Sequence, residues 1–542
     1  MIDCLIIGPN ELKVNKQARV YSMIGSENSI PNRILKQETI RVNKQVFSAP
    51  GIIANLEGKP KSEIFDSVSM PHILSPAIIC LGSYLYDRGI IDFDYINLFL
   101  RQKDELKEKL INNKVLTVAI TTTLYTTPEP IWEIISFIKK YNKEAKIIVG
   151  GPFIQGEVLS KNENDINKLF ATLDADVYIN SNQGEESLYQ AVKAIKEEQP
   201  LKTVPNIFYK DGNNYIETYE QVEKSQLECP LENWKLFGER IGDFVFIKTA
   251  QSCPFTCAFC EFKQREGKYQ NMEVALIEKQ LDAVEKYTKA KSVVFIDDSF
   301  NIPKERFREI LKMMIRNKYS FKWSSFFRGQ DVDEETVKLL KESGCEFLKL
   351  GLESGNQQIL DNMNKRTKVE GYYNAIELLN KYEIPHWTSF IVGFPGETHE
   401  TFQDTVNLIE TAKPMFYRVS PWYFSPFTPI EKQRDKYGLT GGRYEWKHNT
   451  MDTETAMNLC DEMVVNIKNS INLVLVEEDI MSLNHQGISI EEIKTFSKYF
   501  NEGIKEKILN SEQKEISRDI IEKLEYSVSH WGKADADKRQ GE

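Results

Sequence analysis

The stretch AQSCPFTCAFCEF, residues 250–262, carries the chemistry around which the rest of the chain is organised. It places Cys253, Cys257 and Cys260 in a C-x-x-x-C-x-x-C spacing, directly after an apolar run at residues 244–247. Three thiolates this close in sequence can reach one metal centre without ligands from distant parts of the fold. A structural zinc site takes four protein ligands, and a cubane iron–sulfur cluster usually takes four thiolates. The motif supplies three, which favours a cluster with one iron open to a non-protein ligand.

Two other interpretations of these cysteines stay open at this point. No further Cys or His follows until Cys345, so a zinc knuckle would need a remote fourth ligand. Alternatively, the cysteines pack as small apolar residues. The pattern of the residues that follow favours the cluster.

Composition limits the class of protein. The 542 residues are enough for about three or four domains, and 41% hydrophobic with 27% charged residues is typical of a soluble globular protein. No apolar run of about eighteen residues occurs and the N-terminus lacks a basic region, so we expect no membrane segment and no signal peptide. A net charge of −11 argues against nucleic acid as a partner. Eight cysteines, scattered apart from the one motif, predict a reducing, cytoplasmic location.

Residues 244–432 alternate apolar runs with helical stretches, which predicts a partial (β/α)6 barrel related to the eight-stranded barrel. The six apolar runs are residues 245–248, 292–296, 322–327, 347–352, 386–392 and 417–424. The helical stretches between them are residues 272–289, 304–317, 333–343, 371–382 and 397–412. Polar and glycine residues follow the runs, at the strand ends where such barrels place their chemistry.

These strand ends resemble those of the radical S-adenosylmethionine (SAM) enzymes. The cysteine spacing with its aromatic Phe259, GLESG at 351–355 and GFPGET at 393–398 all fit that family. In the family, the open iron chelates SAM, and an electron from the cluster cleaves SAM to methionine and a 5′-deoxyadenosyl radical. The resemblance implies SAM-binding roles for Phe259, Asp297, Asp298, Arg328, Glu353, Ser354, Gly393, Pro395 and Gly396.

By that resemblance, Phe259 and the glycine-rich turn at residues 393–396 lie near the adenine. The two aspartates, Arg328 and Glu353 line the methionine and ribose end. Ordinary barrel capping is the alternative for such residues, with Thr398 as a helix N-cap, Gly355 as a turn residue and Arg328 in a salt bridge.

Residues 1–198 alternate apolar runs with helical stretches, which predicts a second α/β domain with a Rossmann-like, doubly wound parallel sheet. Its apolar runs are residues 4–7, 115–120, 147–149 and 177–179, and its helical stretches are residues 77–88, 130–141 and 187–197. Ligands in such sheets bind at the carboxyl ends of the strands. The polar and glycine residues at those ends are Thr121, Thr122, Thr123, Gly150, Gly151, Pro152, Gly184 and Glu185.

This domain resembles the cobalamin-binding domain found upstream of many radical SAM domains, and the same eight residues are then implied as cobalamin-binding. Further matches to that family are Leu81, Leu85, Gly89 and Leu188. The D-x-H-x-x-G motif, which supplies a cobalt ligand in other cobalamin enzymes, is missing, and His72 is the only histidine in the N-terminal half. A flavodoxin-like domain that merely docks or receives substrate is the alternative.

The remaining segments are less informative. The sequence of residues 199–243 is typical of a connector, with a β-ribbon around Asp211. Residues 433–542 predict a helical C-terminal domain with helices at 453–475, 488–500 and 512–529. Before them, W-x-H-x-T-M at 446–451 weakly resembles phosphinate-methylating members of the family. It makes His448 a candidate catalytic acid or base, or else a cap of the following helix.

Together the resemblances imply a cobalamin-dependent radical SAM enzyme that methylates an unactivated carbon, or a phosphinate phosphorus, of a peptide or natural-product substrate. The implied cofactors are a [4Fe–4S] cluster, SAM and cobalamin, and the implied electron source is an external flavodoxin- or ferredoxin-type reductant. Two alternatives are a radical SAM enzyme that performs cyclisation, epimerisation or rearrangement, and a metal-stabilised binding module without catalysis.

Overall fold

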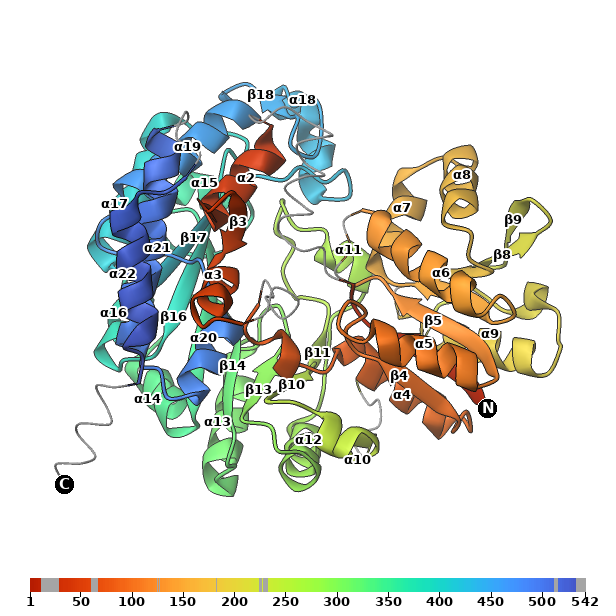
Figure 1. The fold of residues 1–542 in the computed structure, drawn as a ribbon. Coiled ribbons are helices and arrows are strands. Elements are labelled where there is room, and N and C mark those ends of the chain that lie inside the picture. Colours follow the sequence, from red (N-terminus) through yellow and green to blue (C-terminus); the bar gives the residue numbers. More distant parts are fainter. Residues whose placement is uncertain are drawn as a thin grey trace. The chain divides into compact units, whose positions relative to one another are not determined.

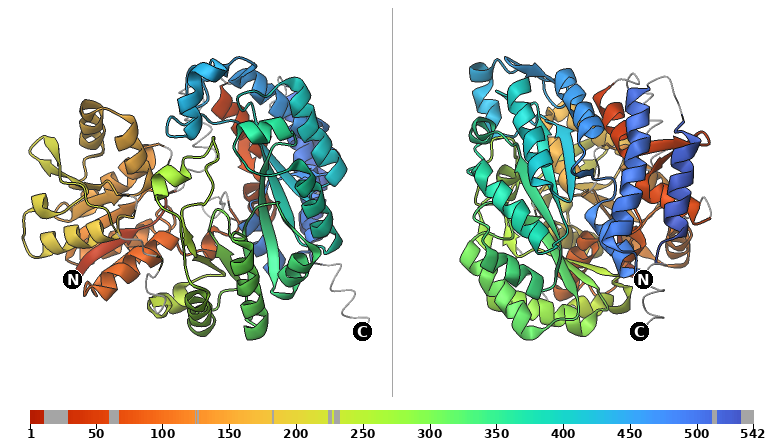
Figure 2. Two further views of the ribbon diagram at one scale, coloured as in Figure 1. Left: turned by 180° about the vertical axis from the view of Figure 1, so that it is seen from behind. Right: turned by 90° about the vertical axis from the view of Figure 1, so that its left-hand side faces the viewer.

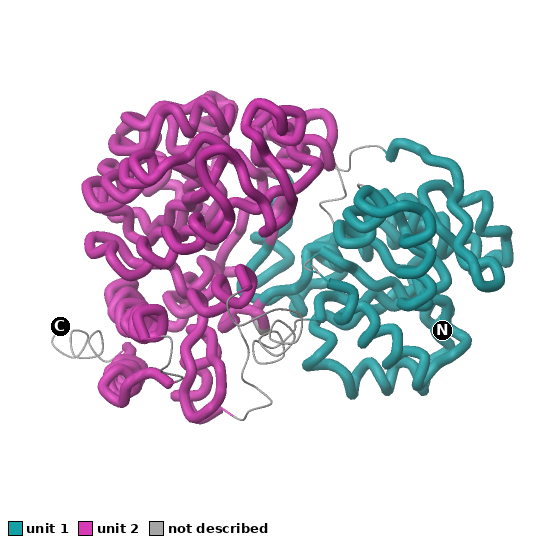
Figure 3. Tube along the Cα trace, turned by 90° about the horizontal axis from the view of Figure 1, so that it is seen from above, with its two compact units in different colours: residues 1–12, 73–245, 279–289 teal, residues 13–72, 246–278, 290–542 magenta. Residues whose placement is uncertain are grey.

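The computed structural model describes residues 1–10, 29–59, 67–123, 125, 127–181, 183–223, 227, 233–510 and 515–532. Its contacts divide the chain into two compact units (Figure 3). Unit 1 comprises residues 1–12, 73–245 and 279–289, and unit 2 comprises residues 13–72, 246–278 and 290–542. Within the described ranges, no helix has the length and hydropathy needed to span a bilayer.

The sheet of unit 1 has the strand order β4-β1-β5-β6-β7-β8-β9 (Figure 1). Its first five strands are parallel, and β8 and β9 are antiparallel. Numbered along the chain, the parallel strands read 2-1-3-4-5, the flavodoxin-like doubly wound order. The predicted Rossmann-like fold is therefore confirmed. The strands are β1 (Ile2–Ile7), β4 (Phe93–Ile96), β5 (Val115–Thr121), β6 (Lys146–Gly150), β7 (Val177–Ile179), β8 (Ile207–Asp211) and β9 (Asn214–Glu217).

Helices cover both faces of this sheet because its strands are apolar on both sides. All six residues of β1 are buried. Leu5 and Ile7 join a large apolar cluster, and Cys4 and Ile6 point to the other face because side chains alternate along a strand. Helix α4 packs against α9, and α5 packs against α6. The helices of unit 1 are α4 (Pro76–Asp87), α5 (Lys103–Asn112), α6 (Glu129–Tyr141), α7 (Pro152–Ser160), α8 (Glu163–Leu173), α9 (Glu185–Lys196) and α10 (Trp234–Phe237).

The hairpin β8–β9 extends this sheet, although the sequence predicted a separate connector there. Its Tyr215 enters an aromatic core in which Phe170 and Tyr178 stack with ring centroids 3.8 Å apart. Tyr215 meets both rings edge-on, at 5.6 and 5.3 Å, and its hydroxyl donates to the Ala175 carbonyl at 2.8 Å. The ribbon itself was predicted. Its attachment to the sheet of unit 1 was not, because that attachment depends on these tertiary contacts. Strand β4 was not predicted either, since it is only four residues long.

The sheet of unit 2 has the order β10-β13-β14-β15-β16-β17-β20. Strands β13 to β20 pair in parallel along this order. The first six strands coincide with the six predicted runs, so the partial barrel is confirmed, and β20 is an unpredicted seventh strand. These strands are β10 (Phe244–Ile247), β13 (Ser292–Phe295), β14 (Lys322–Phe327), β15 (Cys345–Glu353), β16 (His386–Val392), β17 (Phe416–Pro421) and β20 (Ile471–Asn472). Three small ribbons accompany it, β2 (Thr39–Val42) with β3 (Gln45–Ser48), β11 (Ala250–Gln251) with β12 (Gln270–Asn271), and β18 (Lys447–His448) with β19 (Met451–Asp452).

Helices line the outer side of this curved sheet (Figure 2). The helix predicted at residues 453–475 ends at Asn466, because the chain then turns into β20, and α20 was not predicted. The helices of unit 2 are α11 (Phe262–Glu266), α13 (Lys304–Asn317), α14 (Glu334–Glu342), α15 (Gln357–Asn362), α16 (Val369–Lys381), α17 (His399–Ala412), α18 (Arg434–Tyr437), α19 (Thr453–Asn466), α20 (Glu477–His485), α21 (Ile490–Leu509) and α22 (Arg518–Ser529). Helix α12 (Val274–Tyr287) begins in unit 2 and continues into unit 1 at residue 279.

Residues 30–59 and 67–72 belong to unit 2, whereas the predicted domain boundaries were 1–198, 199–243, 244–432 and 433–542. Helix α2 (Ile30–Glu38) lies beside α19 and α21, and α3 (Ala49–Leu56) lies beside α22 (Figure 1). Arg33 and Gln37 of α2 both bind the carboxylate of Asp461, at 2.5 and 2.7 Å. A prediction of contiguous domains cannot reveal an insertion that buries its apolar residues against helices more than 400 positions away.

The aromatic core of unit 1 makes a testable prediction. Tyr215→Ala removes a buried ring and a buried hydrogen bond, so we expect it to lower the free energy of unfolding by about 3 kcal/mol. The matched control is Tyr219→Ala in the chain just after β9, where the side chain is 55% exposed. Chemical denaturation of the full chain measures both. Equal, small losses for the two variants would show that the hairpin is not part of the core.

Candidate active site

The three cysteines lie on the loop between β11 and α11, directly after strand β10. Pairing of β11 with β12 closes the base of this loop. Ser252, just before the first cysteine, has a φ of +61°, in the left-handed region that non-glycine residues rarely adopt. Its hydroxyl is buried and has no hydrogen-bond partner within the described structure. Strain and unpaired polar atoms of this kind gather at functional sites.

The thiols sit in surroundings that favour a bound cation. Cys257 is buried, and Cys253 and Cys260 are partly buried. Burial, together with the neighbouring charges of Cys257, Asp298 and Cys253, raises the pKa of the Cys260 thiol to about 12. A coordinated metal reverses that tendency, because a thiol that binds a metal loses its proton. The donor set therefore fits a cationic metal centre.

The thiols do not form a ready-made site for a single ion. In the described part of the chain, no three Cys, His, Asp or Glu side chains are grouped so that they could hold one metal ion. A cubane cluster does not require such convergence, since each thiolate binds a different iron.

Asp297, which follows β13, holds the base of the cysteine loop. Its Oδ1 accepts from the backbone N–H groups of Thr249 and Ala250, at 2.7 and 2.9 Å. Its Oδ2 accepts from the Thr249 hydroxyl. Arg306 of α13 donates to the Thr249 carbonyl at 2.9 Å and to the Met272 carbonyl at 3.1 Å. Asp297 was predicted to line SAM, and here its carboxylate fastens the turn that precedes the cysteines. Arg306 was not predicted, because no local pattern marks it.

The neighbouring Asp298 differs from Asp297 in its surroundings. Its side chain is exposed, whereas that of Asp297 is buried. Asp298 is therefore the aspartate of the pair that is accessible to a ligand.

Arg328, at the end of β14, covers one side of the loop. Its guanidinium carbon lies 3.7 Å from the centroid of the Phe255 ring. Its Nη2 donates to the carbonyl of Lys365, and its Nε is buried without a partner in the described chain. The predicted alternative, a salt bridge, is not formed, because no carboxylate of the described residues lies within 4.0 Å of this guanidinium. An unpaired, charged N–H donor is suited to a carboxylate ligand.

Phe259 lies beside a buried ion pair. The Lys365 ammonium is 2.9 Å from Glu353 Oε1 and 5.7 Å from the centroid of the Phe259 ring. Glu353 has a φ of +71° at an irregularity in the pairing of β15 with β16. Its Oε2 accepts from Ser389 at 3.4 Å. Lys365 was not predicted, because it follows α15 and not a strand.

Ser354 is held by hydrogen-bond contacts within the protein. Its hydroxyl is buried, lies 3.4 Å from that of Thr405 and accepts from the Asn356 N–H at 3.1 Å. Gly355 permits close packing, since an added Cβ would lie 2.6 Å from the backbone of α17. These two residues dock the end of β15 onto that helix.

Partly exposed side chains line one face of the sheet. Along β16, Trp387, Ser389 and Ile391 are partly exposed, whereas the residues between them are buried. Gly351 and Arg418 are the neighbours of Ser389 in register on the adjacent strands, and neither is fully buried. A filled barrel would bury all of these positions. These partly exposed positions form an open face of the sheet, which includes Ser389, the hydrogen-bond partner of Glu353.

The turn at residues 393–397 is tightly folded on itself. A Cβ on Gly393, whose φ is +89°, would lie 2.5 Å from the Trp446 ring. The Gly393 N–H donates to buried Glu397, and the Pro395 carbonyl accepts from Asn362 at 3.2 Å. Phe394 meets Phe259 edge-on at 6.4 Å.

The glycines that frame this turn are explained by packing. Gly396 has a φ of +100°, and an added Cβ would collide with the Asn362 side chain. Thr398 accepts from the Thr401 N–H in a capping box, which confirms its predicted N-cap role. The backbone at Gly393 and Gly396 packs closely against Trp446 and Asn362. The predicted approach of this backbone to an adenine stays a prediction.

His448 is buried and engaged on both ring nitrogens. Its Nε2 lies 3.0 Å from the Gly393 carbonyl, and its Nδ1 lies 3.2 Å from the Thr450 hydroxyl. The ring stacks on Trp446 with centroids 5.1 Å apart, and burial lowers its pKa. The alternative of a helix cap is wrong, because Asp452 caps α19. This geometry favours a structural role over the predicted catalytic one.

In unit 1, the implied corrin-binding residues collect at the carboxyl ends of β5 and β6. Thr121 and Thr122 are buried and donate to the carbonyls of Ile7 and Gly150, at 3.2 and 2.9 Å. Thr123 is exposed. Gly151 has a φ of +115° and packs against Thr122, where a Cβ would lie 2.9 Å from the hydroxyl oxygen. The two buried hydroxyls fix the shape of the strand ends.

The other implied residues lie at helix N-termini beside these strand ends. The exposed Pro152 begins α7. Gly184, with a φ of +83°, precedes α9, and the buried Glu185 accepts from the Cys80 thiol at 3.2 Å. Strand β1 lies between β4 and β5, so the strand order reverses here, and such a switch point is where doubly wound sheets bind ligands.

Comparison with known proteins assigns the central segment. Residues 247–409 match the family model described as the Radical SAM superfamily. This segment, which contains the three cysteines and the strand ends of β13 to β16, is therefore a radical SAM domain. The prediction of a radical SAM enzyme with a [4Fe–4S] cluster and SAM as cofactors is confirmed.

Relatives and solved structures extend the similarity beyond that segment. "Uncharacterized methyltransferase PH0819" of Pyrococcus horikoshii is 24% identical over 332 residues, which cover 59% of this chain and 69% of that protein. The anaerobic magnesium-protoporphyrin IX monomethyl ester cyclase of Cereibacter sphaeroides is 28% identical over 375 residues, 64% of this chain and 58% of the cyclase. The structure of OxsB, a cobalamin-dependent SAM radical enzyme with aqua-cobalamin bound, covers 90% of each chain with a TM-score of 0.56 at 15% identity. At that identity the likeness shows the shared fold.

The network under the cysteine loop predicts an effect on local opening. Arg306→Gln removes the charged donors to Thr249 and Met272, so amide hydrogen exchange at residues 249–253 should accelerate by about tenfold or more. Arg308→Gln, on the same helix but paired with Asp333 at 2.6 Å, is the control. Mass-spectrometric exchange on the full chain measures both. Unchanged exchange in Arg306→Gln would contradict the anchoring role.

Glu397 predicts a dependence of stability on pH. Burial raises the pKa of this carboxyl from 4.5 to about 8, so the folded state holds the proton more tightly than the unfolded state. Stability should therefore fall as pH rises from about 4.5 to 8, by up to about 1.4 kcal/mol per pH unit. Glu397→Gln removes this contribution, and the exposed Glu400→Gln should retain it. Denaturation midpoints at several pH values test this, and parallel pH profiles for wild type and Glu397→Gln would refute it.

Proposed function

We propose that this protein is a cobalamin-dependent radical SAM methyltransferase. The observation that carries the proposal is that one chain combines a flavodoxin-like sheet with a radical SAM domain whose three-cysteine loop stands at a strand end. The fold shared with OxsB over 90% of the chain supports cobalamin as the second cofactor. The name of the relative PH0819 supports methyl transfer.

The thiolates of Cys253, Cys257 and Cys260 would hold three irons of the cluster. When bound, the cluster supplies the electron that cleaves SAM, and the corrinoid supplies a methyl carrier. The protein's own contribution begins with Asp297 and Arg306, which fix the turn from which the cysteines project. Fixed donors of this kind spare the site any rearrangement when the ligand binds.

Arg328, Glu353 and Phe259 are proposed to hold SAM. The unpaired Nε of Arg328 would donate to a carboxylate. Glu353, held by Lys365 and Ser389, would accept from hydroxyls of the ribose. Phe259, with Phe394 edge-on beside it, offers an aromatic face to the adenine. We place at the edge of this proposed SAM site Asp298, Ser354 and the turn at residues 393–396.

Unit 1 is proposed to bind the corrinoid at the carboxyl ends of β1, β5 and β6. The exposed Thr123 and the backbone of Gly150, Gly151 and Gly184 can approach a bulky ligand closely. Unit 1 contains no histidine. Its cobalt would therefore have no histidine ligand from this unit.

The substrate is proposed to be a peptide or small natural product that reaches the open face around Trp387, Ser389 and Arg418. An external one-electron reductant of the flavodoxin or ferredoxin type would supply electrons in the cytoplasm. A second candidate function is ring closure without methyl transfer, because a relative at 28% identity is named as a cyclase.

Product analysis separates the two candidates. Anaerobically reconstituted protein with SAM, hydroxocobalamin and a chemical reductant should yield both 5′-deoxyadenosine and S-adenosylhomocysteine. Formation of 5′-deoxyadenosine without S-adenosylhomocysteine would contradict the methyltransferase and favour the cyclase-type reaction.

The cysteine loop predicts an outcome for substitution. Changing Cys253, Cys257 and Cys260 together to Ala should abolish iron binding and SAM cleavage, because no other cysteine lies on this loop. Cys345→Ala, a buried cysteine at the start of β15, should retain both activities. Iron quantification and chromatography of 5′-deoxyadenosine provide the readouts. Cleavage retained in the triple variant would overturn the assignment.

A further inference from the structure

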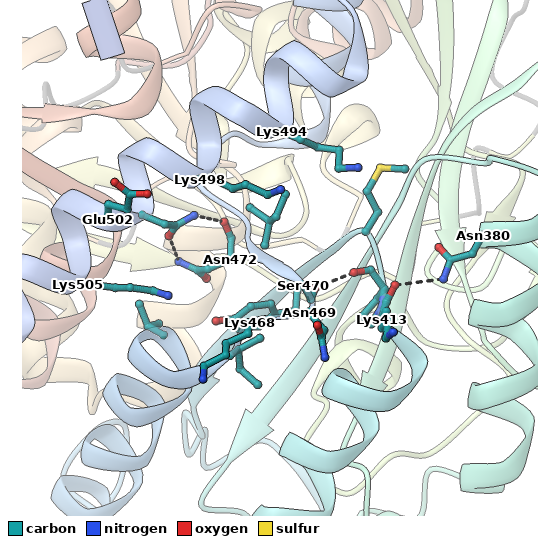
Figure 4. Close-up of a pocket in the computed structure, with 17 residues that line it drawn as sticks. Asn380, Lys413, Lys468, Asn469, Ser470, Asn472, Lys494, Lys498, Glu502 and Lys505 are labelled. Atoms are coloured by element: carbon teal, nitrogen blue, oxygen red, sulfur yellow. Dashed lines mark hydrogen bonds between the residues drawn. The ribbon is translucent and has the colours of Figure 1, made fainter. Parts of the chain in front are cut away.

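A separate cavity lies in unit 2 at the amino ends of β17 and β20. The cysteine loop, in contrast, follows the carboxyl end of β10. The cavity has a volume of about 500 Å³, which is in the range of small-molecule sites. The chain segments just before β17 and β20 form one side, and helix α21 forms the other (Figure 4).

Positive charge dominates this cavity. Its charged lining residues are Lys413, Lys468, Lys494, Lys498, Lys505 and Glu502. Those from α21 recur every three to four residues, so they share one face of the helix. Figure 4 shows the α21 lysines on one side and Lys413 and Lys468 on the other. The ammonium groups therefore surround the cavity in a chain whose net charge is −11.

Most of this charge is not neutralised by the protein. In the part of the chain that the structure describes, four of the five lysines have no carboxylate within 4.0 Å; these are Lys413, Lys468, Lys498 and Lys505. Lys494 pairs with Glu491 at 2.7 Å. Glu502 pairs with Lys523, outside the cavity lining, at 3.1 Å. None of these four ammonium groups donates a hydrogen bond to a carbonyl oxygen of the described residues either.

Two asparagines that hydrogen-bond to each other line the cavity between the lysines. Asn472 donates to the Asn501 side chain at 3.0 Å, and Asn501 donates back to the Asn472 carbonyl at 2.8 Å. Burial lowers the pKa of Lys505, and the like charge of Lys468 adds to this, against the opposite effect of Glu502 and Glu410. A bound anion would offset both effects, because a nearby negative charge favours the charged form of the lysine.

We propose that this cavity binds a small, multiply charged anion of the class of polyphosphorylated metabolites, such as a nucleoside triphosphate. Ammonium groups bind phosphate oxygens as point charges and do not require the planar geometry that arginine imposes. An anion with several phosphates offers oxygens to lysines on both sides of the cavity at once. An extended nucleic acid or an acidic protein surface fits less well, because the lysines line a cavity and not a convex face. The proposal does not depend on the radical chemistry at the cysteine loop.

Calorimetry on the whole 542-residue chain, without cluster or corrinoid, tests the site. The probes are inorganic tripolyphosphate and ATP. Lys468→Gln combined with Lys498→Gln removes two exposed, unpaired charges, and we expect the Kd for both probes to rise by at least about tenfold. The matched control is Lys312→Gln with Lys338→Gln, two exposed lysines on α13 and α14. It changes the net charge equally and should bind as the wild type does.

Three outcomes would overturn the site. One is no binding of either probe by the wild type, and another is equal weakening in the control, which would mean non-specific attraction. The third is a single-stranded oligonucleotide that binds more tightly than tripolyphosphate and competes with it, which would mark a nucleic-acid surface. Unchanged unfolding midpoints of the free variants establish that any loss of binding is not a loss of fold. The calorimetry uses iron-free protein, so a negative result would not contradict the proposed methyltransferase. A negative result in the product analysis would likewise not contradict the anion site.

Discussion

The buried carboxylate of Asp297 is the constraint on which the candidate active site depends. It accepts two backbone N–H groups and one hydroxyl from the turn that leads into the cysteine loop. Arg306 holds the same turn from the other side. A loop that must hold thiolates on a metal centre loses conformational freedom, and a fixed base reduces that loss. The three cysteines thus leave the sheet from a point that two strands and one helix define together.

Much of the architecture was predictable because it follows from periodicity. Six apolar runs became β10 and β13 to β17, and the switch from strand to helix spacing gave both parallel sheets. The cysteine spacing is local, so its position on one loop was predictable too. Residues 30–59 and 67–72, which the sequence placed in the N-terminal domain, belong to unit 2 in the structure, because an insertion carries no sign of which core it joins. Arg306 and Lys365 were missed for a related reason, since their importance arises only from what lies beside them.

The glycine-rich turn shows where motif and packing give different explanations. Gly393 is required by the Trp446 ring, and Gly396 is required by Asn362. The same Trp446 stacks on His448, which leaves that histidine bonded on both nitrogens. A sequence pattern identified these positions as important without indicating that they contact one another. Their shared role here is to fasten the end of β16 to the chain before α19.

Electron paramagnetic resonance of the reduced, reconstituted protein, recorded with and without SAM, tests most directly whether the three cysteines hold a cluster with one open iron. We expect about four irons per chain and a signal that changes when SAM is added, because SAM then binds the iron that the three cysteines leave open. A protein that holds a single zinc ion, or a cluster signal that SAM does not alter, would contradict this expectation.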